Sequence, residues 1–296
     1  MKKTTKMLAI LLAAMTALSG CGGSGTTTTQ TEGKTETTAA AEKTGTETAQ
    51  KGPKDEVVTM AVISSWDTLN IYNTSGNYGN AVADQLFERL VTRTHDGVIE
   101  PRLATEWQIA DDNKSMTFKL AENALWHDGE KLTANDIVFT CKAMTNPDVD
   151  NYYRSAFNVL AGTDDDGVAA DTDQVGVEAV DDYTVKFSFK EPKDQDTILN
   201  AFLSFLYVLP EHILDTGNYA DINNSSFWTS PVGAGPFKYV KDTAGETLEM
   251  EAFEDYYQGC PDFKTLVVRV VPAANLTAGL LNGDIDVQYK GKKYIC

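Results

Sequence analysis

The side chains that could carry out nucleophilic, acid–base or metal chemistry are few and scattered along the chain. His95, His127 and His212 are the three histidines, and their spacing matches no arrangement of zinc ligands. The sequence contains no Gly-x-Ser-x-Gly turn, no histidine close to a cysteine, and no glycine-rich loop that opens a helix as a phosphate site requires. The residue types therefore predict no catalytic centre, no metal site and no cofactor.

Carboxylates are abundant, and two groups of them invite comparison with calcium loops. Residues 111–122 place oxygen-bearing side chains at positions 1, 3, 5 and 12 of an EF-hand pattern, but Met116 replaces its turn glycine. In the Asp-rich stretch 164–173, the corresponding first position is Gly162, which has no side-chain oxygen. We expect a β-hairpin at the first place and a solvated loop at the second.

The balance of charge excludes one class of partner. The 296 residues include 43 acidic and 25 basic side chains, which gives a net charge of −18. Nucleic-acid binding requires a positive surface that displaces counterions, so no nucleic acid is expected as a partner. Because 42% of the residues are hydrophobic, the chain can build a core and is not wholly disordered.

Residues 1–20 have the organisation of an export signal peptide. A basic start precedes the apolar run 7–18, which is too short to span a bilayer. The following Leu-Ser-Gly-Cys resembles the lipobox of bacterial lipoproteins, which implies cleavage before Cys21 and lipidation of its sulfur. The alternative is an ordinary signal peptide with a chance cysteine.

Residues 21–55 comprise the lipidated Cys21 and a Thr-rich stretch that lacks aromatic, Leu, Ile and Val side chains after it. Such a stretch has nothing to bury and predicts a disordered tether. We expect attachment to the cell membrane on its extracytoplasmic face, and a tether of this length favours a Gram-positive surface over a thin periplasm.

The remaining sequence alternates between strand and helix patterns. A capping box at Thr133 and Asp136 opens a predicted helix that ends at Asn146-Pro147. A buried unit of helix, or of helix and strand, is expected over 198–214. Strands are predicted over 57–63, 181–190 and 265–272, hairpins around 107–120 and 231–253, and helices over 81–93 and 273–283. Strand 265–272, helix 273–283 and the strand that follows Gly283 form a βαβ unit.

Five separated motifs resemble a known family when they are taken in order. They are LFERLVTRTHDGVIEPRLATEW, MTFKLAENALWHDGEKLTANDIVFT, PVGAGPFKYV, EDYYQGCP and LLNGDIDV. Together they resemble the extracellular solute-binding proteins of family 5, the oligopeptide, dipeptide and nickel receptors of ATP-binding cassette (ABC) importers. The resemblance covers residues 57 to about 288.

The resemblance implies an α/β (mixed α+β) fold, a periplasmic-binding-protein-like first lobe with an inserted subdomain. It assigns 56–95 and 195–288 to the first lobe, which is discontinuous, and 96–194 to the inserted subdomain. Residues 289–296 form an atypical tail that does not resemble the family. The family runs to about twice this length, so we expect the second lobe to be missing and the chain to be a truncated or incomplete copy.

Ligand contacts are expected in the loop after the first strand and at the strand end after Asp286. The candidates are Trp66, Asp67, Tyr72, Tyr78 and Gln288. Trp and Tyr offer flat apolar faces with a polar edge, and a carboxylate can pair with the amino terminus of a peptide. Packing in the core or in the loop is the alternative for each aromatic residue.

The resemblance thus implies a substrate-binding lipoprotein that captures peptides for an ABC permease and its ATPase and has no catalytic step. With one lobe, we expect binding that is too weak to support uptake. The alternatives are a secreted surface hydrolase, either a peptidase or a glycosidase, and a non-binding surface remnant.

Overall fold

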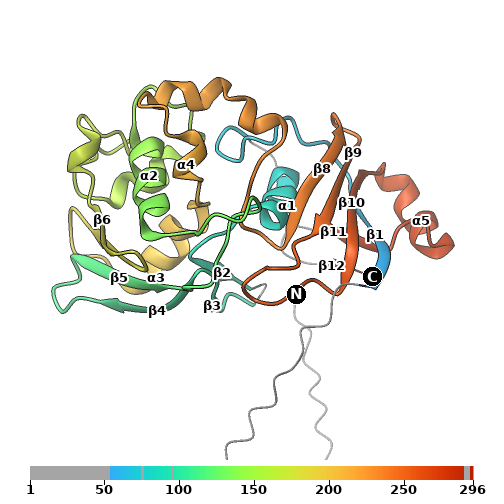
Figure 1. Ribbon diagram of the computed structural model, residues 1–296, viewed down its shortest axis with the longest axis horizontal. Coiled ribbons are helices and arrows are strands. Elements are labelled where there is room, and N and C mark those ends of the chain that lie inside the picture. The colour runs from blue at the N-terminus through green and yellow to red at the C-terminus, as the bar shows by residue number, and fades with distance from the viewer. Residues whose placement is uncertain (1–53, 75–76, 95, 290–293, 296) are drawn as a thin grey trace, which may run out of the picture. The chain divides into compact units, whose positions relative to one another are not determined.

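The computed structural model describes residues 54–74, 77–94, 96–289 and 294–295 (Figure 1). The predicted signal peptide, the predicted lipidation at Cys21 and the predicted tether up to residue 53 lie outside these residues. The last two positions of that tether, Lys54 and Asp55, instead begin β1, because Lys54 pairs with the neighbouring strand. The strands are β1 Lys54–Val62, β2 Val91–Arg93, β3 Ile99–Pro101, β4 Ala104–Ile109, β5 Ser115–Leu120, β6 Val177–Asp181, β7 Thr184–Ser188, β8 Phe237–Thr243, β9 Thr247–Ala252, β10 Phe263–Val270, β11 Val287–Tyr289 and β12 Tyr294–Ile295. The α-helices are α1 Asn77–Leu86, α2 Ala134–Thr145, α3 Gln195–Thr197, α4 Glu211–Leu214 and α5 Leu276–Asn282.

A six-stranded mixed sheet has the order β12-β11-β1-β10-β9-β8, with β1 parallel to both β10 and β11. The β-branched sequence of β1 suits this central place, because a strand in the middle of a parallel arrangement is covered on both faces. Met60 and Val62 point to the main core, which includes α1, whereas Ala61 packs with Leu276 of α5 on the other face. Figure 1 shows α1 and α5 on opposite sides of the sheet.

The expected βαβ unit is confirmed in its elements. Helix α5 connects β10 to β11, and Gly283 ends it in the left-handed conformation with φ 77°. Only a residue without a Cβ adopts this conformation at little cost. The strands of the unit are not neighbours, since β1 lies between them.

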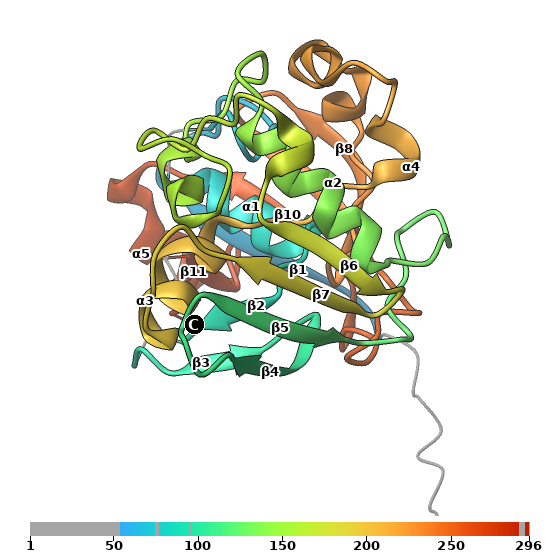
Figure 2. The ribbon, with the colours of Figure 1, turned by 90° about the vertical axis from the view of Figure 1, so that its left-hand side faces the viewer.

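A second, antiparallel sheet has the order β4-β5-β7-β6, and α2 packs on it (Figure 2). The expected hairpin is present as β4 and β5, and the EF-hand-like residues 111–122 lie in its turn, in β5 and in the two positions after β5. The predicted capping box of α2 is confirmed, with the Thr133 N–H donating to the Asp136 carboxylate over 2.8 Å. Asn146 is the C-cap, as the Asn-Pro pair predicts.

The predicted helix over 81–93 is wrong in its extent. Helix α1 begins at Asn77 and ends at Leu86, and Val91 already pairs with Pro101 in the two-stranded sheet of β2 and β3. The physical reason is a long-range contact, because the Leu86 carbonyl accepts a hydrogen bond of 3.0 Å from the Gly235 N–H. The apolar residues whose spacing suggested a longer helix are still buried in the core, both before and after the end of α1 at Leu86.

Residues 198–214 combine several short elements rather than one helix. A π-helical segment at Ile198–Phe202 follows α3, a 3₁₀ turn at Leu203–Phe205 follows it, and α4 comes after an extended stretch. Further 3₁₀ turns are Arg154–Val159, Thr172–Gln174, Tyr219–Asn224, Ser226–Thr229 and Ala273–Asn275.

His127 fixes the corner that precedes β8. Its Nδ1 accepts from the Gly233 N–H at 3.1 Å, and its Nε2–H donates to the Gly235 carbonyl at 2.9 Å. Burial lowers the pKa of His127 to about 4, so the ring is neutral at neutral pH. The glycines of this corner are needed because a Cβ on Gly233 would lie 1.7 Å from the Leu86 carbonyl oxygen.

The mixed α/β class expected from the sequence is confirmed. The six-stranded sheet uses strands from 54–62 and 237–295, and the four-stranded sheet uses strands from 104–188. The division into lobe and inserted subdomain stays a prediction.

Cys141 is buried and Cys260 half-buried, and both are free thiols. In the described part of the chain, no helix has the length and apolar character that crossing a membrane would need.

Candidate functional site

The loop after β1 begins at the edge of the sheet where the parallel strands end. Because β1, β10 and β11 run in the same direction, their carboxyl ends lie along one edge. In open α/β sheets, ligands bind in crevices outside the carboxyl ends of the strands. Trp66 and Asp67 lie four and five positions after the end of β1, so the topology places two of the predicted site residues at this edge.

A small cavity of about 230 Å³ lies against this loop. Trp66 and Asp67 form part of its wall. Asp242 near the end of β8, Gly245 in the β8–β9 turn and Trp228 form another part. The Trp66 side chain is only 5% exposed and packs in the core, so its ring supports the cavity wall more than it opens to solvent. The proposed contact of Trp66 with a ligand stays a prediction.

The Asp67 carboxylate is exposed and held in one position. The Thr74 hydroxyl donates to it over 2.8 Å, and the Thr74 carbonyl accepts from the Tyr153 hydroxyl at 3.0 Å. Partial burial and then the negative charge of Asp67 raise the pKa of Tyr153. An anionic group is thus fixed beside a tyrosine that comes from a distant segment.

Three aromatic side chains, which we call the aromatic shelf, continue from this carboxylate. The shelf consists of Tyr152, Tyr153 and Phe205. The Tyr153 and Phe205 rings stack with their centroids 5.0 Å apart, and Tyr152 meets Tyr153 at 6.4 Å. Tyr152 is 67% exposed and Phe205 is also exposed. The Tyr152 N–H donates to the Tyr72 carbonyl at 2.7 Å, which joins the shelf to the loop after β1.

The sequence reasoning missed the shelf. Phe205 lies some fifty positions after the tyrosine pair, and no periodicity relates them. The only local signal was the Tyr-Tyr pair after the end of α2, where two large aromatics stand in a polar stretch. Phe205 is the last residue of the 3₁₀ turn that follows the π-helical segment.

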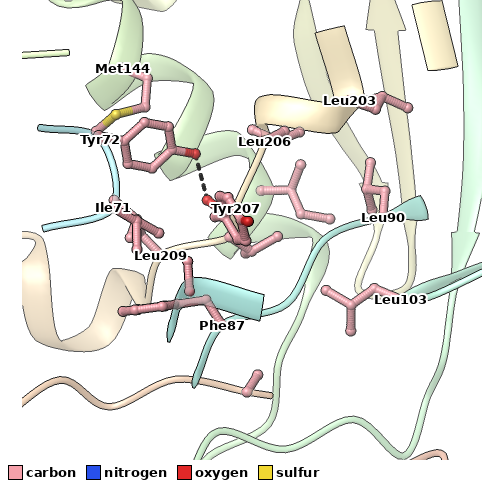
Figure 3. Packing of buried hydrophobic residues seen from close by; sticks show 14 of the residues in the cluster. Ile71, Tyr72, Phe87, Leu90, Leu103, Met144, Leu203, Leu206, Tyr207 and Leu209 are labelled. Atoms are coloured by element: carbon pink, nitrogen blue, oxygen red, sulfur yellow. Dashed lines mark hydrogen bonds between the residues drawn. The ribbon is translucent and has the colours of Figure 1, made fainter. Parts of the chain in front are cut away.

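The expectation that Tyr72 faces a ligand is wrong. Its side chain is 1% exposed, and its hydroxyl donates to the Tyr207 carbonyl over 2.6 Å (Figure 3). The ring also packs at 6.4 Å from Phe157, and burial raises the pKa of the hydroxyl. Tyr72 anchors the loop to the core. Packing in the core was the alternative expected for each aromatic candidate.

The remaining candidates are not brought to Asp67. Tyr78 is the second residue of α1, but its side chain lies outside the described part of the structure. Gln288 is 7% exposed on β11, where it pairs with Ala61, and it does not line the Asp67 cavity. Contacts of both residues with a ligand stay predictions. Within residues 54–289, apart from the undescribed positions, no group of three or more His, Cys, Asp or Glu side chains is placed to hold a metal ion.

Comparisons with known proteins agree with this fold. Residues 98–293 match the model of bacterial extracellular solute-binding proteins, family 5 Middle. The oligopeptide-binding protein AppA of Bacillus subtilis is 27% identical over 290 residues, which cover 96% of this chain and 47% of AppA. The periplasmic murein peptide-binding protein MppA of Escherichia coli is 30% identical over 219 residues, or 70% of this chain and 38% of MppA.

Solved structures show the same similarity. The structure of Bacillus subtilis AppA in complex with a nonapeptide matches with a TM-score of 0.69 and 27% identity, over 80% of this chain and 44% of that one. Campylobacter jejuni NikZ in complex with Ni(L-His) matches with a TM-score of 0.66 and 27% identity, over 78% and 43%. The chain spans less than half the length of these relatives. The family match extends over more than half of the chain, and the chain therefore belongs to the bacterial extracellular solute-binding proteins of family 5.

Proposed function

We propose that this chain binds di- or oligopeptides outside the cytoplasm as part of the substrate-binding component of an ABC importer. Asp67 would pair with the amino terminus of the peptide, and the aromatic shelf would contact its apolar side chains. The observation that carries this proposal is the exposed Asp67 carboxylate, which Thr74 holds beside Tyr153. Relatives named as peptide-binding proteins support it, and a further relative, from Brucella ovis, has the provisional name of an ABC transporter peptide-binding protein.

The chemistry of this surface suits a peptide. A carboxylate with one internal hydrogen bond retains lone pairs for an ammonium group, and charge-assisted hydrogen bonds are the stronger ones. Tyrosine and phenylalanine faces accept apolar side chains of varied shape, which suits a ligand of varied sequence. The role requires no bond to be broken, so the peptide would be released unchanged.

The affinity of the described surface alone is expected to be low. Tyr152 is largely exposed, whereas sites with high affinity bury most of the ligand surface. We expect dissociation constants near the millimolar range, which corresponds to about 4 kcal/mol of binding free energy.

Membrane attachment through Cys21 belongs to the same proposal. A lipid on this residue would hold the receptor near its permease and ATPase partners, and the tether 21–55 would allow the folded part to reach them. The motif Leu-Ser-Gly-Cys after the apolar run 7–18 supports this part of the proposal.

The test is incubation of the purified chain with a defined peptide mixture, followed by nuclear magnetic resonance of the peptides and mass spectrometry. Line broadening of peptides with apolar side chains and their quantitative recovery without cleavage are expected. Cleavage products would indicate the surface hydrolase instead. Unchanged peptide spectra at millimolar concentrations of both components would refute the proposed binding.

A further inference from the structure

A second cavity, of about 290 Å³, lies at the end of α1 and beside β2. Its wall includes Arg89, Arg93 and Arg102, together with Asp84 and Glu88. The chain has only five arginines and a net charge of −18, so three guanidinium groups around one cavity are a strong local departure from the overall composition. The cavity shares no lining residue with the one beside Asp67.

The two carboxylates of the cavity are occupied by donors within the protein. Glu88 has a side chain only 2% exposed, and it accepts from Nε and Nη2 of Arg102 and from the Tyr257 hydroxyl. Asp84 accepts from Arg89 at 2.5 Å and from the Tyr207 hydroxyl at 2.6 Å.

Arg89 and Arg102 therefore have a structural role, because each neutralises a carboxylate of the protein. Arg93 has no such partner among the described residues. Among the residues that the structure describes, Arg93 forms no ion pair, and its side chain is exposed at the cavity. Three guanidinium groups and two carboxylates leave a local charge of +1. The half-buried Thr92 in the same wall has a hydroxyl that can also donate.

We propose that this cavity binds a small oxyanion group, a phosphate or a carboxylate, with Arg93 as its principal ligand. A guanidinium presents several N–H donors in a planar fork that matches the oxygens of both groups. Arg89 and Arg102 are paired with Asp84 and Glu88, so the net positive charge of this wall comes from Arg93. A volume of about 290 Å³ lies at the lower end of the range of ligand sites, which suits a small anion better than an oligopeptide.

The test is titration of the purified full chain with inorganic phosphate at constant ionic strength, followed by calorimetry or ³¹P nuclear magnetic resonance. A parallel titration with acetate distinguishes a phosphate site from one that also takes carboxylates, and saturation with either anion supports the proposal. The variant is Arg93→Gln. Lys119→Gln is the matched control, because Lys119 is an exposed cation on β5 that does not line the cavity.

Saturable binding is expected, with a dissociation constant about tenfold higher in Arg93→Gln and unchanged in Lys119→Gln. Because Arg93 is exposed and forms no ion pair with a described residue, both variants should melt at the wild-type temperature. Absence of saturation with both anions would overturn the proposal. So would an equal weakening in the two variants, since that would indicate a general effect of net charge.

Discussion

The Thr74 hydroxyl donates a hydrogen bond of 2.8 Å to the Asp67 carboxylate, and this bond closes the loop between β1 and α1. Thr74 also accepts from the Tyr153 hydroxyl through its carbonyl oxygen, so one residue connects the loop to the aromatic shelf. The carboxylate and the shelf are therefore oriented before a ligand arrives, which reduces the entropy that binding costs.

The corner before β8 should not tolerate a side chain at Gly233. In Gly233→Ala the new Cβ would lie 1.7 Å from the Leu86 carbonyl oxygen, so the backbone must move and the bonds to His127 must weaken. We expect a loss of about 3 kcal/mol in the free energy of unfolding, measured by urea denaturation. Gly217→Ala is the control, because Gly217 has positive φ but no atom near the position of a Cβ. It should lose only about 1 kcal/mol, and equal losses in both variants would contradict the steric explanation.

The stability of the protein should depend on pH through His127. Its folded-state pKa of about 4 lies below the ordinary value of 6.5, so the unfolded chain binds the proton more readily. The contribution is fully present above pH 6.5 and is lost as the pH falls to about 4, to an extent of about 3 kcal/mol.

Urea denaturation of wild type and His127→Gln between pH 7 and pH 4 measures this contribution. Carboxylates titrate in both proteins, so the difference in slope isolates His127. The variant should be less stable at pH 7 and should lose less stability on acidification. Parallel curves for the two proteins would show that the ring is not buried in its neutral form.

The Glu88 carboxylate should depend strongly on Arg102. Burial raises the pKa of Glu88, and the paired guanidinium opposes that effect. In Arg102→Met the carboxylate would remain buried without its cation, which typically costs about 3–5 kcal/mol. Thermal denaturation should show a large fall in Tm, whereas Lys119→Met, at an exposed ion pair, should change little. A wild-type Tm in Arg102→Met would mean that the hydroxyls of Tyr256 and Tyr257 are enough to stabilise the buried Glu88 carboxylate.

The elements with local signals were predictable from the sequence. The hairpin of β4 and β5 follows from alternating apolar residues around a polar turn, and the capping box of α2 follows from Thr133 and Asp136 three positions apart. The end of α1 was not predictable, because the donor that caps Leu86 is Gly235, nearly 150 residues later.

The candidate site was predictable only in part, for the same reason. Asp67 lies in the loop that follows β1, and the strand pattern alone places this loop at the sheet edge. A tyrosine after a strand can be either an exposed ligand contact or a core residue, and the sequence does not distinguish the two. Tyr72 is buried because it contacts Tyr207 and Phe157 from distant segments. The shelf at Tyr153 and Phe205 likewise arises from tertiary packing.

Membrane attachment should depend on Cys21. In Cys21→Ser the sulfur that would carry the lipid is absent, so the protein should move from the membrane fraction to the soluble or secreted fraction of the producing cells. Immunoblots of the fractions measure this, with Cys260→Ser as the control for a free thiol elsewhere. Retention of the Cys21→Ser variant in the membrane would contradict a lipid anchor at this residue.

The most direct measurement for the proposed function compares one apolar peptide with its N-acetylated form on wild type and on Asp67→Asn. Dissociation constants would be obtained from nuclear magnetic resonance titrations at millimolar concentrations. If Asp67 pairs with the amino terminus, acetylation should weaken binding to wild type about tenfold, and Asp67→Asn should weaken binding of the free peptide similarly. The two changes together should cost no more than either alone, because they remove the same contact. Equal affinity of wild type for both peptides, or losses that add, would contradict the assignment of Asp67 as the residue that binds the amino terminus.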